Sequence, residues 1–268
     1  MDITVIIPTY NRYKFLKRAL ESVFTQTYKV KEVIVIDDGS NDNTSQIQQD
    51  FSNIKYFYQA NKGVSSARNL GIKKSSYEWI AFLDSDDEWH EDKLNIQVNF
   101  HKNNKDILIS YTDELWIRNN EIVKIPKKFV KHGGEIFKEC LSHCIIAPSA
   151  TLIHKSLLDE VGLFDESLEV CEDYDLWLRI AVKNEIGLVD EKLITKYAGH
   201  DDQLSFQHWG MDRFRVMALE KLLLNYDKNT EIIDMLKKKY SVLLKGAKKY
   251  DKIADIKIYE KRLRELDE

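Results

Sequence analysis

Short apolar runs alternate with helix-like segments through the first hundred residues. The apolar runs are residues 3–7, 33–36, 54–58 and 79–83, and the helix-like segments are residues 14–24, 44–51 and 66–73. Strands that alternate with helices form parallel sheets, so this half of the chain predicts repeated βαβ units. Because ligands of such sheets bind outside the carboxyl ends of the strands, the polar loop after each apolar run is where functional residues are expected.

The second half of the chain has a mixed pattern. Further strands are predicted at residues 107–111, 114–117, 121–125 and 148–153, with a turn at 119–120, and helices at 155–161 and 172–182. An amphipathic helix is expected at 211–224, with one apolar face formed by Met211, Phe214, Met217, Ala218 and Leu222. Residues 230–265 read as further, lysine-rich helix. We therefore predict an α/β fold with a mostly parallel, Rossmann-like central sheet flanked by helices, a mixed second half and a helical C-terminal tail.

Composition and charge narrow the class of protein. The chain has 268 residues, 43% of them hydrophobic, and 44 acidic against 40 basic residues. It is therefore expected to be globular, and a strongly basic nucleic-acid binder is excluded. The last 41 residues hold 12 bases and 8 acids, while the preceding 227 hold 28 bases and 36 acids. The pattern is that of an acidic body with a basic tail.

The chain lacks sequence signals for secretion or membrane insertion. Its first residues lack the basic region and cleavage site of a signal peptide, and no apolar stretch approaches the roughly 18 residues of a membrane span. Cys140, Cys144 and Cys171 are too few for a disulfide framework, so we expect reduced thiols in a cytoplasmic protein. His143 lies between two of these cysteines, but no second ligand pair has the spacing of a zinc site.

Six lysines of the tail admit two interpretations. They are Lys237, Lys238, Lys239, Lys245, Lys248 and Lys249. They can rest on an anionic membrane, or form the solvated face of a helix that packs through residues such as Leu236 and Leu243. The interspersed acids favour the solvated helix.

The loop after the first strand is Pro8-Thr9-Tyr10-Asn11-Arg12. It lacks the glycine-rich turn that brings backbone close to a pyrophosphate, which argues against a dinucleotide-binding domain. Tyr10 offers a flat ring on which a base can stack, and Thr9 offers a small hydroxyl. The alternative is an ordinary helix start with Asn11 as its cap.

Adjacent carboxylates, Asp37 and Asp38, end the second predicted strand. Two such groups are costly unless they have partners, so they indicate a cation, a nucleobase N–H or a basic side chain nearby. An acidic pocket like that of response regulators remains an alternative. So does a loop in which Asp42 or Asn43 caps the next helix.

The sharpest local signal is Asp84-Ser85-Asp86-Asp87, directly after an apolar strand. In an extended chain Asp84 and Asp86 project to one side, which suits coordination of a hard divalent ion together with a diphosphate. An EF-hand loop starting at Asp84 fails, because its sixth and twelfth positions hold Trp89 and Asn95. A phosphatase motif fits poorly because it needs Thr or Val at position 87. Solvated acids that cap the helix expected at 91–101 remain the structural alternative.

Two later features can join this acidic turn. Arg68 lies on the helix that leads to the Asp84 strand and can reach the acids or a phosphate, or else lie on the surface. Glu172 and Asp173 open a helix, where its dipole stabilises carboxylates and so explains at least one of them as a cap. A carboxylate kept ionised at such a position is also suited to act as a general base.

Taken in order, these motifs resemble the inverting nucleotide-sugar glycosyltransferases of family 2, which have the GT-A fold. The matching segments are residues 6–12, 35–40, 61–63, 67–69, 82–87 and 172–173. The resemblance implies a glycosyltransferase domain over 1–210, with a nucleotide-sugar half (1–105) and an acceptor half (106–210). A helical extension would occupy 211–268.

The resemblance also implies a role for each matching residue. The nucleotide sugar would be bound by Pro8, Thr9, Tyr10, Arg12, Asp37, Arg68, Asp84, Ser85 and Asp86. Mn²⁺ or Mg²⁺ would be held by Asp86, or by Asp87 in an overlapping reading of the motif. Asp173 would be the general base, and His200 and Gln203 would lie in a segment that closes over the donor and its phosphates.

The function so implied is non-processive, metal-dependent, inverting transfer of a sugar from a nucleoside diphosphate sugar, with UDP favoured. The acceptor would be a saccharide or a lipid-linked saccharide, in surface polysaccharide or glycoconjugate synthesis. Residues 203–209 lack the arginine of the processive Gln-x-x-Arg-Trp motif. We expect a cytoplasmic location, or one at the inner face of the membrane through the basic tail. The alternatives are a phosphatase-type hydrolase and a non-catalytic nucleotide-sugar-binding module.

Overall fold

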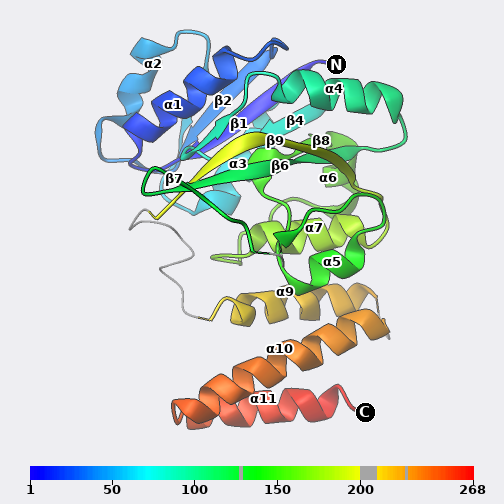
Figure 1. The fold of residues 1–268 in the computed structure, drawn as a ribbon. Helices are drawn as coiled ribbons and strands as arrows, with labels where there is room; N and C mark the ends of the chain where they lie inside the picture. Colours follow the sequence, from blue (N-terminus) through cyan, green and yellow to red (C-terminus); the bar gives the residue numbers. More distant parts are fainter. Residues whose placement is uncertain (127–128, 200–209, 227–228) are drawn as a thin grey trace.

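A nine-stranded mixed sheet forms the centre of the molecule (Figure 1). The computed structural model describes residues 1–126, 129–199, 210–226 and 229–268. The strands are β1 (Ile3–Thr9), β2 (Glu32–Asp37), β3 (Lys55–Tyr58), β4 (Trp79–Phe82), β5 (Asp87–Trp89), β6 (Ile109–Arg118), β7 (Glu121–Val123), β8 (Leu152–His154) and β9 (Gly187–Ala198). Their order is β3-β2-β1-β4-β8-β6-β9-β5, and β7 pairs with β6.

The first half is the parallel βαβ arrangement that the sequence predicts. Strands β3, β2, β1 and β4 are parallel neighbours. They are joined by α1 (Tyr13–Phe24), a short helical pair η1 (Asn43–Gln46) and α2 (Ile47–Asp50), and α3 (Val64–Lys74). All seven residues of β1 are buried. Gly71 lets α3 approach this strand, because a Cβ at that position would lie 2.4 Å from Ile6 Cγ2.

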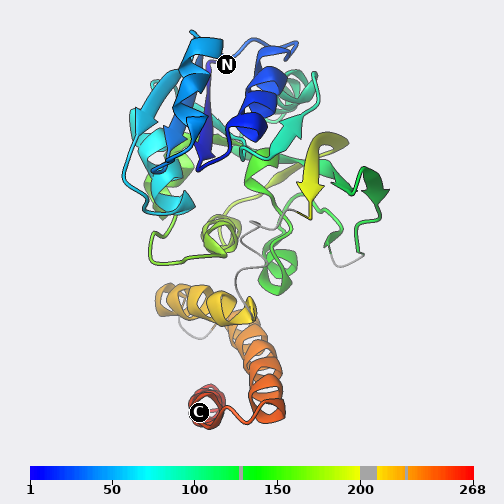
Figure 2. The same ribbon diagram turned by 90° about the vertical axis from the view of Figure 1, so that its left-hand side faces the viewer.

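The second half adds antiparallel and parallel strands beside β4. β8 is antiparallel to β4 and β6, β9 is parallel to β6, and β5 is antiparallel to β9. The helices and turns are α4 (Lys93–Asn103), α5 (Phe137–Ser142), η3 (Pro148–Ala150), α6 (Lys155–Val161) and α7 (Glu172–Ala181). α1 and α4 cover one face of the sheet, and α3, α6 and α7 lie on the other (Figures 1 and 2). The sequence-based expectation of a mixed half is confirmed.

Three details of this half differ from the sequence prediction. The two runs expected at 107–111 and 114–117 form one strand, β6, and residues 148–150 are a 3₁₀ turn that precedes β8. β9 was not predicted, because its consecutive charged residues at 190–192 break the alternation of a half-buried strand. The predicted turn at Asn119 and Asn120 is present, with φ of 52° and 63°.

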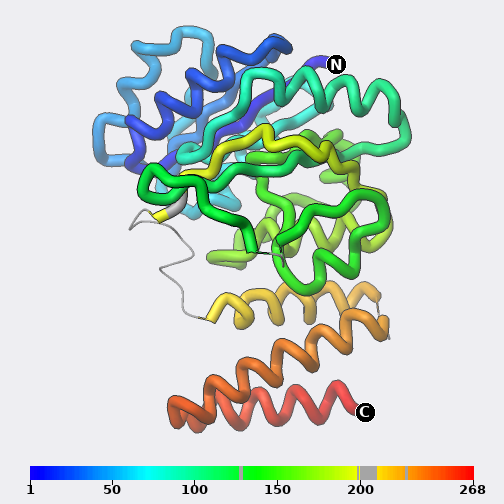
Figure 3. Tube along the Cα trace, in the orientation of Figure 1, coloured from blue at the N-terminus to red at the C-terminus, as the bar shows by residue number. Residues whose placement is uncertain are grey.

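The C-terminal tail forms three helices, α9 (Asp212–Asn225), α10 (Thr230–Lys249) and α11 (Ile253–Glu265). The helix expected over 230–265 is present as two helices, because the chain turns at 250–252 (Figure 3), where Asp251 has a φ of 50°. Met217, expected on the buried face of α9, is exposed. Lys239, expected to be solvated, is buried and donates to Ser142 O at 3.0 Å and Asp212 Oδ1 at 3.1 Å. None of the helices described is long and apolar enough to cross a membrane.

Candidate functional site

The loops that carry the sequence motifs meet at one edge of the sheet. β1, β2 and β4 are parallel, so the segments that follow them end on the same side of the molecule, where α7 also begins (Figure 2). This side is the left of Figure 1. The predicted convergence of these loops follows directly from the parallel order of the strands.

Asp37 and Asp38 fix the loops after β2 and β3. Asp37 is buried and accepts hydrogen bonds from Tyr56 Oη and, at 2.8 Å, from Ser40 N. Asp38 accepts from Gln59 Nε2 at 2.6 Å and from two backbone N–H groups, at residues 62 and 63, at 2.9 and 2.8 Å. Asp38 therefore stabilises the loop that borders the site. Its position in the sequence, next to Asp37, did not indicate this structural role.

The segment after β1 presents a ring and a hydroxyl. Tyr10 is 45% exposed, and within the described residues the buried Thr9 hydroxyl has no hydrogen-bond partner. Asn11 does not cap α1, as the alternative reading expected. Instead its φ is 53°, and its side chain accepts from Asn41 N at 2.8 Å. Asp42 caps η1 by accepting from the backbone N–H of residue 44.

The acidic motif forms a turn, and the expected extended chain is wrong. Asp87 N donates to Asp84 O at 3.0 Å, so the chain turns and the three carboxylates point in different directions. Each of them lies near a different basic side chain. Asp84 Oδ1 accepts from Arg68 Nη2 at 2.6 Å, and Asp86 Oδ2 accepts from Arg12 Nη1 at 2.7 Å. Asp87 points inward, with its Oδ2 3.8 Å from Lys196 Nζ.

Ser149, which the sequence did not indicate, holds this turn from beneath. Its hydroxyl donates to Asp87 Oδ2 at 2.6 Å and accepts from Asp84 N at 3.0 Å, and its carbonyl accepts from Trp89 Nε1 at 2.8 Å. Burial raises the pKa of Asp87 to about 7, against the opposing attraction of Lys196. Ser85 is also buried in this turn.

Arg68 connects the acidic turn to α7. Only 4% of its side chain is exposed, and Nη1 donates to Glu172 Oε1 at 2.7 Å while Nη2 binds Asp84. Burial raises the pKa of Glu172 to about 7, and neighbouring Asp173 adds to this rise. For Asp84, burial also acts to raise the pKa, but the attraction of Arg68 outweighs it and lowers the value. The surface alternative for Arg68 is therefore wrong, and the predicted contact with the acids is confirmed.

Asp173 is the second residue of α7 and is partly exposed. Its Oδ1 accepts from Tyr174 N at 2.7 Å. The preceding Cys171 has a φ of 64°, a left-handed conformation at the start of the helix. Burial raises the pKa of the Cys144 thiol, and the adjacent Asp173 adds to the rise. Glu172 thus points to Arg68, while Asp173 remains accessible beside it.

The residues present fit a divalent ion whose ligands would be both carboxylate oxygens of the protein and phosphate oxygens of a bound diphosphate. Asp84 and Asp86 retain 24% and 18% exposure of their side chains, and carboxylate oxygens are suitable ligands for Mg²⁺ or Mn²⁺. Across the described part of the chain, no three His, Cys, Asp or Glu side chains form a ready metal cage. One or two carboxylates completed by phosphate oxygens is the arrangement expected for Mg²⁺. His200 and Gln203 lie outside the described residues.

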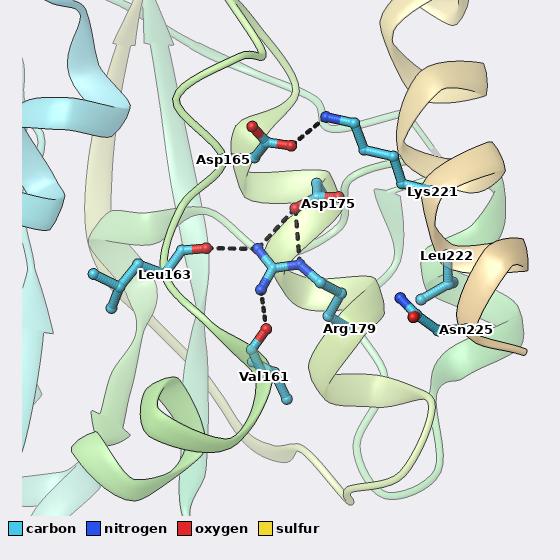
Figure 4. Close-up of a pocket in the computed structure, with 8 residues that line it drawn as sticks. All are labelled: Val161, Leu163, Asp165, Asp175, Arg179, Lys221, Leu222 and Asn225. Atoms are coloured by element: carbon cyan, nitrogen blue, oxygen red, sulfur yellow. Dashed lines mark hydrogen bonds and ion pairs between the residues drawn. The ribbon is translucent and has the colours of Figure 1, made fainter.

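A separate cavity of about 280 Å³ lies between α7 and α9 (Figure 4). Its charged groups are paired with one another. Arg179 binds Asp175 Oδ2 at 2.7 Å and the carbonyls of Val161 and Leu163, and Lys221 of α9 binds Asp165. These contacts join the C-terminal helices to the sheet domain.

The fold and the edge site define an α/β protein of the GT-A type. Among solved structures with this fold, S. aureus TarS 1-349 in complex with UDP-GlcNAc has a TM-score of 0.72 and 22% identity, over 89% of this chain and 71% of that one. The mannosyltransferase PcManGT from Pyrobaculum calidifontis, in complex with GDP-Man and Mn²⁺, has a TM-score of 0.65 and 15% identity, over 99% of this chain and 84% of that one. The predicted GT-A architecture is confirmed.

Residues 4–162 match the sequence profile of Glycosyl transferase family 2, and the chain belongs to this family. An uncharacterized glycosyltransferase of Rickettsia felis is 38% identical over 196 residues, which are 71% of this chain and 32% of that protein. Escherichia coli WfgD, named UDP-Glc:alpha-D-GlcNAc-diphosphoundecaprenol beta-1,3-glucosyltransferase, is 34% identical over 191 residues, 70% of this chain and 73% of its own length. The chain spans about a third of the length of several curated relatives.

Proposed function

We propose that this protein transfers a sugar from a UDP-sugar to a lipid-linked saccharide, with inversion and one sugar per encounter. Membership of family 2 and the names of relatives such as WfgD support the donor and acceptor classes. The observation that carries the proposal is the Arg68 bridge. By binding Asp84 and Glu172 at once, it keeps the acidic turn next to the start of α7, where Asp173 lies.

The donor occupies the edge of β1, β2 and β4 in this proposal. Its binding residues are Pro8, Thr9, Tyr10, Arg12, Asp37, Arg68, Asp84, Ser85 and Asp86. The exposed Tyr10 ring stacks on the base, and the Thr9 hydroxyl, which has no partner among the described residues, is available to it. A divalent ion held by Asp86, with Asp87 as the second candidate, would stabilise the charge of the departing diphosphate.

Asp173 acts as the general base. Its partly exposed carboxylate, at the start of α7, can accept the proton of an acceptor hydroxyl. The acceptor oxygen forms its bond to the anomeric carbon on the face opposite the diphosphate, whose bond to that carbon breaks. The configuration is thereby inverted without a protein nucleophile, and the proton stays on Asp173 until it passes to solvent.

A thermal-shift panel of UDP-, GDP- and TDP-sugars, with and without Mn²⁺, tests the donor class. We expect stabilisation by the UDP-sugar only when the metal is present, and Asp86→Ala should remove it. An Asp159→Asn variant, which changes an exposed carboxylate of α6, is the control and should behave as wild type. No stabilisation by any nucleotide sugar would refute the proposal.

Asp173→Asn separates binding from transfer. It should retain the metal-dependent thermal shift and lose transfer, since a positioned base contributes about 10²–10⁴ in rate. Near-normal transfer would exclude Asp173 as the base.

Metal-dependent binding without donor turnover in the wild type would identify a binding module. Phosphate release from a simple monoester without nucleotide would identify the phosphatase alternative.

A further inference from the structure

The turn between α10 and α11 combines exposed apolar and basic side chains. Tyr250 and Ile253 are 67% and 61% exposed, and Val242 and Ile258 on the adjoining helical turns are 61% and 53% exposed. We call residues 242–258 the hairpin tip. It contains five lysines (245, 248, 249, 252 and 257) and two aspartates, although the body of the protein is acidic.

The positive charge is concentrated at this end of the hairpin. Lys245, Lys249 and Lys257 are exposed, and Lys249 Nζ lies 5.2 Å from the centre of the Tyr250 ring. Lys248 of the hairpin tip binds Glu260 at 2.8 Å. The other end of the hairpin has several such pairs. Lys237 binds Asp267 at 2.6 Å, and two further basic residues, at 261 and 262, bind a glutamate at 265. The hairpin tip is therefore an amphiphilic, basic end on an acidic protein.

The hairpin tip faces the same side as the candidate site. In Figure 1 the turn after α10 lies at the left, as do the carboxyl ends of β1 and β2 and the start of α7. Figure 2 is viewed from that side, and all of these features face the viewer. The hairpin is also tied to the body, because Tyr240 Oη donates to Glu220 at 2.7 Å and Lys239 binds Asp212.

We propose that the hairpin tip docks on an anionic lipid bilayer. Tyr250 and Ile253 enter the interfacial region, where an amphipathic tyrosine ring is favourable, and the lysines contact lipid phosphates while their stems cover apolar surface. Docking in this orientation turns the candidate site toward the membrane surface. The inference goes beyond the proposed transfer reaction, because it concerns lipid binding without any nucleotide sugar.

Co-sedimentation of the full chain with vesicles tests the proposal. Phosphatidylcholine vesicles with phosphatidylglycerol should bind the protein, vesicles of phosphatidylcholine alone should bind it much less, and added salt should weaken binding. Lys245→Glu/Lys249→Glu should reduce binding about tenfold or more, because two positive charges near the surface are replaced by two negative ones. Tyr250→Ser/Ile253→Ser should reduce it at unchanged charge. These side chains are exposed, so we expect the variants to fold.

Lys102→Glu/Lys105→Glu is the matched control, since it makes the same charge change at the end of α4, on the opposite side in Figure 1. It should leave vesicle binding unchanged. Equal sedimentation with both vesicle types, or equal losses in the control and hairpin-tip variants, would overturn the proposal. So would self-association that Tyr250→Ser/Ile253→Ser abolishes, because it would assign the hairpin tip to a second copy. The metal-dependent thermal shift with UDP-sugar, measured without lipid, should be unchanged in every variant. A failure of the lipid-binding proposal can therefore be distinguished from a failure of the proposed function.

Discussion

Replacing Arg68 by methionine tests whether the bridge between the acidic turn and α7 stabilises the fold. The change removes two charge-assisted hydrogen bonds, 2.6 and 2.7 Å long, from a side chain that is almost wholly buried. Such bonds each contribute about 1.5–3 kcal/mol, and a buried ion pair that loses one partner typically costs about 3–5 kcal/mol. We therefore expect Arg68→Met to lower the free energy of unfolding by about 3–5 kcal/mol.

The loss should depend on pH because Glu172 can be neutralised. Its pKa is already about 7 beside Arg68, so without the arginine it can take up a proton at modest cost. The destabilisation should therefore be smaller near about pH 6 than near about pH 8. Adding Glu172→Met to Arg68→Met should restore part of the stability, because it removes one stranded carboxylate.

Urea unfolding followed by circular dichroism measures these differences, provided that the slope against denaturant is unchanged. Lys17→Met is the control, since its ion pair with Asp50 at 3.1 Å is solvent-exposed and should contribute little to the free energy of unfolding. A loss for Arg68→Met no larger than that of the control would refute this account of the bridge. The same conclusion would follow if the double variant were as unstable as the sum of its single changes.

Four further substitutions test the acidic turn, the start of α7 and the contact of α9 with the sheet domain. Ser149→Ala should cost about 1–3 kcal/mol by leaving Asp87 without its donor, and should weaken the metal-dependent UDP-sugar thermal shift. Glu172, with a pKa near 7 when folded against an ordinary 4.5, holds a proton that the unfolded chain releases, so stability should fall from about pH 5 to about pH 7. Glu172→Gln should reduce that slope in urea midpoints, and the part that remains is attributed to Asp87, whose pKa is also raised to about 7. Lys221→Met should cost at most about 1 kcal/mol, because its pair with Asp165 is partly exposed to solvent, whereas Leu222→Ala should cost about 2–5 kcal/mol by calorimetry.

The parallel half of the fold could be predicted because its signals are local. Apolar runs coincide with buried strands, and the motif residues follow those strands directly, so parallel pairing alone brings their loops together. The same logic identified the position of Asp173 at the start of a helix. In each case the position of the residue follows from the pattern of the residues next to it in the sequence.

The contacts beneath the acidic turn could not be predicted, because they depend on pairing between distant strands. Ser149 reaches Asp87 only through the insertion of β8 between β4 and β6. Lys196 approaches the same carboxylate from β9, a strand with little sequence signature. Likewise, the sequence alone did not separate Asp37 from Asp38. In the structure, Asp37 is the last residue of β2, whereas Asp38 is the first residue of the loop that follows.

The ion pair between Arg68 and Glu172 has a consequence for how such a protein can change by recombination. The two residues are 104 positions apart, and the segment that matches the family profile ends at residue 162, between them. A crossover between residues 68 and 172 keeps the arginine and imports a foreign residue at position 172. Only imported segments with a carboxylate there complete the pair, so chimeras joined between these two positions must inherit this residue together with the sequence they borrow.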